Sequence, residues 1–189
     1  MDIKNLFKSV TREELFRLYF TNTDAEFYLR ELERNLNIPV ANIRRELLAL
    51  EHDGIFISRR KANLVYYRLN KNYPLFAELK SIVAKTIGVE GSLRSAFSDI
   101  KIDLAFIYGS FAENREKANS DIDVCIVGKT NEEILLHVIN KLEKTLMREI
   151  NYTLYAPEEF EKMKNIKGSF LNQVVKGKII IVKGQLDVG

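Results

Sequence analysis

The sequence predicts an α/β protein of two domains. Residues 1–90 carry apolar side chains at helical spacing in three successive segments, followed by two β-rich runs. Residues 91–189 instead alternate short apolar strands with amphipathic helices, a pattern typical of a sheet covered by helices. Gly88 and Gly91, which lie among polar residues, mark the change from one pattern to the other. We therefore expect one domain over residues 1–90 and a second over residues 91–189.

Three helices are expected in the first third of the chain. Thr11 and Thr23 each precede a glutamate by three residues, which is the capping-box pattern at a helix start. The third helix is expected to begin at Pro39, which suits a first helical turn, and to stop at Gly54, which supplies a left-handed cap. The expected buried faces of the three helices are Leu15, Leu18 and Tyr19; Phe27, Leu29, Leu32 and Leu36; and Val40, Ile43, Leu47 and Leu50.

The remaining elements follow from the same periodicities. A hairpin is expected with strands at 55–59 and 64–69, and a further helix is expected from Pro74 to Ile87. A third capping box, Thr130 to Glu133, introduces a helix in the second domain. The second domain is expected to hold strands at 102–108, 121–127, 149–155 and 178–183, and helices at 131–148, 157–164 and 170–176.

The positive charge of the chain is concentrated in one short segment. The formal net charge is +3, and residues 1–90 hold 15 Lys and Arg against 12 Asp and Glu, whereas residues 91–189 hold 14 of each. Residues 42–71 alone contain seven basic side chains and three acidic ones. This local excess indicates either a surface that meets phosphates or an unevenly charged solvated surface.

The composition argues against several classes of protein. No apolar run approaches the roughly 18–20 residues that a membrane-spanning helix needs, and residues 1–10 lack the features of a signal peptide. Cys125 is the only cysteine, so an intramolecular disulfide is excluded. One cysteine and two histidines are too few ligands for a structural zinc site. We expect a cytoplasmic protein with no membrane partner.

The third helix and the hairpin predict a surface for double-stranded DNA, because three short helices followed by a basic hairpin form the winged-helix arrangement. Burial of the apolar face of the third helix leaves Asn42 and Arg45 facing outward and Arg44 at the edge. These side chains can pair with base edges in a major groove. The tip of the hairpin carries three cations that can reach backbone phosphates or a minor groove: Arg59, Arg60 and Lys61.

The segment from Glu26 to Lys85 also resembles the winged helix-turn-helix of the ArsR-like regulators. The resemblance is carried by the stretch IPVANIRRELLALEHDGIFISRRKANLVYYRL, which matches a recognition helix, an Asp-Gly turn and a wing. It implies DNA binding and, because such domains usually act on two half-sites, a homodimer. Winged helices also serve as protein-docking modules, so docking alone is the alternative.

A second candidate site lies in residues 91–189. A strand is expected to end at Gly109-Ser110 and to turn into a helix, where free N–H groups attract phosphate. Asp121 and Asp123 follow, two residues apart on the next strand, so both carboxylates project from the same face. Two adjacent carboxylates repel unless a cation lies between them, and Mg²⁺ is the usual cation in phosphate chemistry. The pattern therefore predicts a site for a nucleoside triphosphate (NTP) with Mg²⁺.

This pattern of Gly-Ser followed by Asp-x-Asp resembles the polymerase-β-type nucleotidyltransferases, and their minimal members in particular, from about Ile102 onward. The resemblance implies a mixed sheet with helices, nucleotide binding by Gly109 and Ser110, and metal binding by Asp121 and Asp123.

The resemblance also implies a third catalytic acid on a neighbouring strand. The position expected for that acid is Asn151, and an amide supplies neither negative charge nor a base. Glu149, two residues earlier and expected on the same face, is the candidate replacement. Asp121, Asp123 and Glu149 are therefore the candidate catalytic residues, and catalysis itself stays open.

The leading hypothesis is a DNA-binding transcriptional regulator whose second domain binds NTP and Mg²⁺. The alternative is an active nucleotidyltransferase that moves a nucleoside monophosphate to a hydroxyl of a protein or RNA. The resemblance to minimal nucleotidyltransferases further implies an antitoxin role beside a HEPN-type toxin partner. Cys125, His52 and His137 are interpreted as structural residues.

Overall fold

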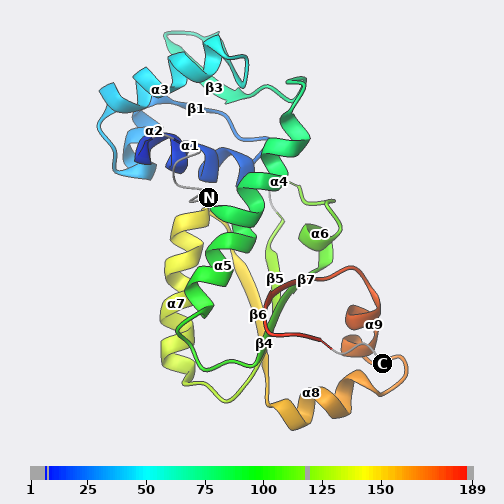
Figure 1. Cartoon of the computed structure of the whole chain (residues 1–189). Coiled ribbons are helices and arrows are strands. Elements are labelled where there is room, and N and C mark those ends of the chain that lie inside the picture. Colours follow the sequence, from blue (N-terminus) through cyan, green and yellow to red (C-terminus); the bar gives the residue numbers. More distant parts are fainter. Residues whose placement is uncertain (1–6, 8, 118–119, 187–189) are drawn as a thin grey trace. The chain divides into compact units, whose positions relative to one another are not determined.

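The computed structural model describes residues 7, 9–117 and 120–186 (Figure 1). The chain divides into two compact units, Met1–Val89 and Glu90–Gly189, and this division lies one residue before the expected boundary. Of the described helices, none has the length and apolarity that a membrane span requires.

The first unit combines helices with a small antiparallel sheet. The strand order in that sheet is β1-β3-β2, and the two-residue turn Ala62-Asn63 joins β2 to β3. The elements of this unit are α1 (Val10–Thr21), β1 (Phe27–Tyr28), α2 (Leu29–Leu36), α3 (Val40–His52), β2 (Phe56–Lys61), β3 (Leu64–Leu69) and α4 (Phe76–Thr86).

The core of the first unit contains most of the apolar faces expected from the sequence. Leu15, Leu18 and Tyr19 of α1, Leu32 of α2, and Ile43, Leu47 and Leu50 of α3 are all buried. The ring of Tyr19 packs edge-on against Phe56 at 4.8 Å between centroids, and its hydroxyl donates to the carbonyl of Tyr67 at 3.0 Å. Burial of each large apolar side chain stabilises the fold by roughly 1.5–3 kcal/mol. Because Ile43, Leu47 and Leu50 are buried, the opposite face of α3 meets solvent.

The starts of the helices differ from the capping-box predictions. Ser9, rather than Thr11, caps α1: its Oγ accepts from the Arg12 N–H at 3.1 Å, and Thr11 is buried inside the helix. The Thr23 box is also wrong, because residues 27 and 28 pair with β3 and stay extended before α2 begins. Asn131, one residue after Thr130, caps α7.

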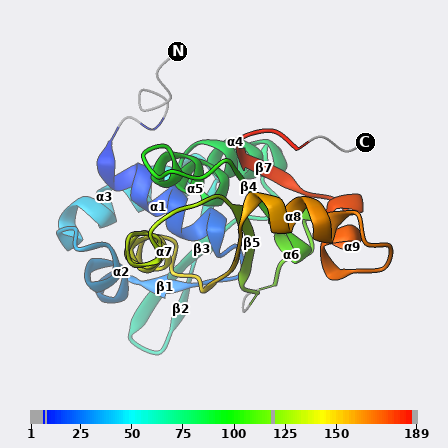
Figure 2. The same cartoon turned by 90° about the horizontal axis from the view of Figure 1, so that it is seen from below.

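The second unit is a four-stranded mixed sheet with helices on both faces. The strand order is β6-β5-β4-β7, with β5 and β6 parallel and the other neighbours antiparallel. Helices α5 and α7 lie on one side of the sheet, and α8 and α9 lie on the other (Figures 1 and 2). The elements are α5 (Val89–Phe97), β4 (Leu104–Tyr108), α6 (Gly109–Ala112), β5 (Ile122–Val127), α7 (Glu132–Leu146), β6 (Ile150–Tyr155), α8 (Pro157–Lys164), α9 (Phe170–Lys176) and β7 (Ile180–Lys183).

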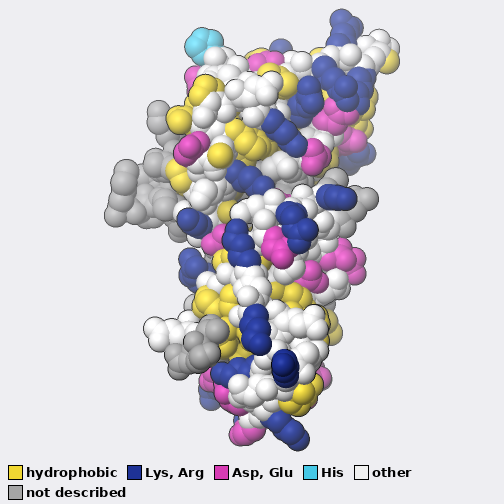
Figure 3. Space-filling model, turned by 90° about the vertical axis from the view of Figure 1, so that its right-hand side faces the viewer, with side chains coloured by type: hydrophobic (Ala, Val, Ile, Leu, Met, Phe, Trp, Pro, Cys, Tyr) yellow, Lys and Arg dark blue, Asp and Glu magenta, His cyan; other side chains and the backbone are white. Residues whose placement is uncertain are grey.

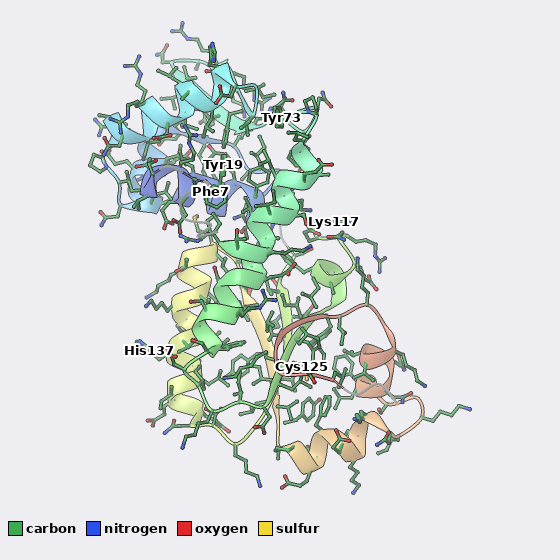
Figure 4. The ribbon with its side chains drawn as sticks, viewed as in Figure 1. Phe7, Tyr19, Tyr73, Lys117, Cys125 and His137 are labelled. Carbon is green, nitrogen blue, oxygen red and sulfur yellow. The ribbon has the colours of Figure 1, made fainter. Side chains whose placement is uncertain are left out.

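Two features of the second unit bear on the sequence predictions. Helix α5, which contains Gly91, occupies the segment expected to separate the domains. One face of the sheet packs against α8 and α9 through a core cluster that includes Phe106 and Cys125. Figure 4 shows Cys125 in the middle of the sheet. Burial raises the pKa of the Cys125 thiol to about 12, which makes it a structural residue rather than a nucleophile.

The cap of α1 provides a direct test of the helix starts. Ser9 accepts from the Arg12 N–H and also donates to Glu46 of α3 at 2.9 Å. We predict that Ser9→Ala lowers the free energy of unfolding by about 1–2 kcal/mol, because it removes both hydrogen bonds. Thr23→Ala, at the expected but wrong cap, is the matched control and should change it by less than about 0.5 kcal/mol. Urea denaturation of the two variants measures the difference, and equal losses would contradict the assignment.

Candidate functional site

Three strand ends meet at one edge of the sheet in the second unit. Because β4 and β5 are antiparallel, the last residue of β4, Tyr108, lies opposite Asp123 near the start of β5. On the other side of β5, the parallel strand β6 places Asn151 in register with Asp123. The edge therefore brings together residues from three separate segments of the chain.

Gly109 allows the carboxylate of Asp123 to approach the backbone. Gly109 opens α6 with φ +69°, and a Cβ atom built on it would lie 2.6 Å from Oδ2 of Asp123. A side chain at this position would therefore both strain the backbone and displace the carboxylate. Ser110 follows Gly109 in α6 and is half-buried. Because Gly109 meets Asp123 directly, both residues belong to the same edge of the sheet as Asp123.

Asp121 and Asp123 lie close enough to influence each other. The pKa of Asp123 is raised above its ordinary value, first by burial and then by the negative charge of Asp121. Burial and a neighbouring like charge both disfavour the ionised form, and a bound cation would relieve both effects. Oxygen ligands of this kind suit Mg²⁺, so the pair fits part of a magnesium site.

Asn151 contributes a hydrogen-bond donor where a third acid was expected. Its Nδ2 donates to Oδ2 of Asp121 at 3.1 Å. Asp121 and Glu149 were expected inside strands, but β5 begins at Ile122 and β6 at Ile150, so both acids lie just before their strands. Glu149 is exposed. Within the described parts of the chain, no three His, Cys, Asp or Glu side chains gather as a metal-binding group.

Arg148 is a residue of this edge that the sequence did not single out. It is buried, and its Nη1 donates to the carbonyls of Lys117 at 2.8 Å and Ser120 at 2.7 Å. Its guanidinium carbon also lies 5.5 Å from the centre of the Phe111 ring in α6. Arg148 thus ties α6 and the segment entering Asp121 to the start of β6. Nothing local in the sequence marks it, because its partners lie about 30 residues earlier.

A second cluster of candidate residues lies on α3 in the first unit. Arg44 and Arg45 are exposed and Asn42 is half-buried, as expected from the burial of the opposite face. Among the described residues, Arg44, Arg45 and Arg60 form no salt bridge. The upper part of Figure 3 shows Lys and Arg side chains gathered over this unit.

The hairpin cations are less available than the sequence suggested. Arg59 donates two hydrogen bonds to the carboxylate of Glu26, at 2.8 and 2.7 Å, and Lys61 forms a salt bridge with the same carboxylate. These partners lower the pKa of Glu26 to about 2, so its carboxylate is charged near neutral pH and offsets part of the hairpin charge. Arg60 and Lys61 also lie in β2 rather than in the turn, and Arg60 donates to the carbonyl of Ala62 at 3.2 Å.

Neither histidine belongs to these clusters. His52 closes α3, and His137 lies on α7, where Figure 4 shows it on the outer side of the helix. Both side chains are exposed.

A known protein family matches the second unit of the chain. Residues 92–185 match the family described as Polymerase beta, Nucleotidyltransferase. No curated protein matches the chain.

Three similar solved structures share only low overall likeness with this chain. A toxin–antitoxin with AMP-PNP is 19% identical, with a TM-score of 0.39, over 51% of this chain and 73% of that one. A mutant of the toxin–antitoxin MntA-HpeT is 17% identical, with a TM-score of 0.37, over 51% of this chain and 73% of that one. The transcriptional repressor BigR from Xylella fastidiosa is 25% identical, with a TM-score of 0.35, over 45% of this chain and 81% of that one. At such TM-scores these likenesses decide neither fold nor function.

The contact between Gly109 and Asp123 can be tested by a double-mutant cycle. We predict that Gly109→Ala destabilises the wild type more than it destabilises an Asp123→Ala background, with a coupling of about 0.5–3 kcal/mol. Gly168 is the matched control, because it has φ +83° but a Cβ atom built on it would meet nothing within 4 Å beyond its own chain neighbours. Gly168→Ala should cost about 1–2 kcal/mol in both backgrounds. Chemical denaturation of the variants measures these values, and equal couplings at the two glycines would refute the contact.

Proposed function

We propose that the nucleotidyltransferase domain formed by residues 92–185 binds a nucleoside triphosphate together with Mg²⁺. The observation that carries this proposal is the carboxylate of Asp123, held against Gly109 with the charge of Asp121 beside it. A half-buried pair of acids at a strand end, next to a glycine that exposes its backbone, suits a cation and the phosphates it accompanies.

Each residue of this edge has a distinct role in the proposal. Asp121 and Asp123 would hold the ion, and Ser110 would donate its hydroxyl to a phosphate oxygen. The ion would supply neutralisation of the triphosphate charge and activation of an attacking hydroxyl. Arg148 keeps the segment before Asp121 in place through the carbonyl of Ser120.

Asn151 argues for nucleotide binding with weak transfer. Two-metal transfer depends on a further carboxylate for the ion that activates the attacking hydroxyl. Asn151 carries no charge, and its amide is committed to Asp121. Glu149 would have to supply the missing charge from an exposed position before β6, and ordering such a side chain costs rotamer entropy. The proposed activity is therefore that of a nucleotide sensor rather than of an efficient transferase.

Active transfer is the alternative function of the same site. In that case the domain moves a nucleoside monophosphate to a hydroxyl of a protein or RNA, and a toxin-type partner stays a prediction. Mass spectrometry of candidate acceptors after incubation with each NTP distinguishes transfer from binding.

We further propose that the first unit is a winged helix that binds double-stranded DNA. The support is the exposed pair Arg44 and Arg45 on α3. The hairpin of the same unit carries Arg60, which forms no salt bridge among the described residues. An exposed helix with two arginines offers the donors that base edges and phosphates accept. Regulation of transcription and action as a homodimer are the parts of this proposal that rest on the sequence resemblance of Glu26 to Lys85 to the ArsR-like regulators.

Removal of the two carboxylates tests the nucleotide site. We predict that Asp121→Asn combined with Asp123→Asn abolishes Mg²⁺-dependent NTP binding in calorimetry, while the control Asp103→Asn, an exposed acid of the same unit, does not. Chelation of Mg²⁺ should have the same effect on the wild type. Unchanged NTP affinity in the double variant would mean that the carboxylates are ordinary surface acids.

A transfer assay tests the role of Asn151. If only the missing charge limits the reaction, Asn151→Asp should create or raise transfer, followed as labelled nucleotide on an acceptor. Strong wild-type transfer that survives Glu149→Gln would contradict the sensor proposal.

Charge variants test the DNA-binding proposal. We predict that Arg44→Ala with Arg45→Ala weakens duplex binding by about 1–3 kcal/mol per lost base contact and reduces the salt dependence of affinity. Glu26→Gln should act in the opposite direction, because it frees Arg59 and Lys61 for phosphates. Arg30→Ala, which removes an exposed arginine paired with Glu33, is the control. No duplex binding by the wild type at low salt would favour protein docking instead.

A further inference from the structure

An exposed aromatic side chain lies close to the acidic edge of the sheet, the end where Asp121 and Asp123 lie. Phe170, the first residue of α9, is 54% exposed, and it is the only exposed phenylalanine or tyrosine in the described part of the chain. A single exposed apolar residue is ordinary on a protein surface, so the weight of the observation lies in the place of Phe170 beside Tyr108, which pairs with Asp123.

The position of Phe170 is fixed by its neighbours rather than by its own burial. Ser169 caps α9, since its Oγ accepts from the Asn172 N–H at 3.1 Å and donates to the carbonyl of Met163 at 2.7 Å. Asn172 in turn donates to the carbonyl of Lys164 at 2.7 Å. Leu171, the next residue, is buried in the core, whereas Phe170 stays exposed.

Tyr108 connects Phe170 to the acidic edge. The two rings meet edge to face, with centroids 5.7 Å apart and planes at 75°. Tyr108 lies directly opposite Asp123 across neighbouring strands, which places both side chains on the same face of the sheet. The pKa of Tyr108 is raised by burial and then by the charge of Asp123, which is consistent with this proximity.

We propose that Phe170, supported edge-on by Tyr108, is the platform on which the base of a bound nucleotide stacks. This inference rests on the proposed nucleotide site, with the phosphates at Asp121 and Asp123 and the nucleoside extending over Tyr108 toward α9. Every base has a π-face, so stacking on Phe170 adds affinity without selecting one base. Phe170 is thus a residue that distinguishes a nucleotide from a bare polyphosphate.

Calorimetry with two probes tests the platform. Wild type and variants are titrated with ATP and with inorganic tripolyphosphate, each with Mg²⁺. We predict that Phe170→Ala weakens ATP binding about five- to tenfold and leaves tripolyphosphate binding unchanged. Phe170→Trp should retain ATP affinity and show quenching of its indole fluorescence on binding. Leu136→Ala, which removes a 50% exposed apolar side chain from α7, is the control and should change neither affinity.

The outcomes separate the platform from the nucleotide site itself. Equal affinities of the wild type for ATP and tripolyphosphate, or an equal loss for both in Phe170→Ala, would overturn the platform while leaving the phosphate site standing. If Phe170→Ala is unstable by circular dichroism, the Phe170→Trp and Phe170→Leu pair decides, because only the aromatic variant should keep full ATP affinity. Binding of neither probe by the wild type would refute the proposed function and the platform with it.

Discussion

The arrangement of the second unit depends on the close approach of the Asp123 carboxylate to the backbone of Gly109. That approach requires a residue without a Cβ atom at the turn from β4 into α6. It also requires β5 to pair with β4, which places Asp123 opposite Tyr108, and the pairing of β5 with β6 adds Asn151 on the other side of Asp123. The partly buried charge that results is costly, and the cation of the proposed function would relieve that cost.

Hydrogen bonds around this edge orient Asp121 and the segment before it without neutralising the acid. Asn151 donates to Asp121, and Arg148 donates to backbone carbonyls at Lys117 and Ser120. A neutral amide orients a carboxylate but leaves its charge in place, which is what the proposed cation site requires. Because Asn151 stands where an acid was expected, the edge also lacks the negative charge that a second ion would need. One residue therefore both favours binding and limits transfer in the proposed mechanism.

The first unit shows the opposite balance, in which an acid moderates a basic surface. Glu26 lies just before β1, and the pairing of β1 with β3 brings it to the hairpin, where it binds Arg59 and Lys61. Exposed pairs of this kind add little stability, so their main effect is on the local charge that a phosphate would meet. The arginines of α3 have no such partner among the described residues, which makes that helix the stronger candidate contact.

Most of the order of helices and strands and most of the buried faces could be predicted from the amino-acid sequence, but β1 and α5 could not. The predicted features depend on local periodicity and on short motifs, such as Ile43, Leu47 and Leu50 at helical spacing or Asp121 and Asp123 two residues apart. The helix starts expected at Thr11 and Thr23 were wrong, because the contact between Ser9 and Glu46 and the pairing of β1 with β3 outweighed the local motif.

The hydrogen-bond partners of individual polar side chains, in contrast, follow from tertiary packing. Glu26 meets Arg59 across 33 residues, Arg148 reaches Lys117 across 31, and Asn151 meets Asp121 across 30. Phe170 likewise meets Tyr108 only because α9 packs on the sheet that β4 belongs to. Contacts of this range arise from the packing of whole elements, and no local periodicity encodes them, because they depend on how strands pair and not on spacing along the chain.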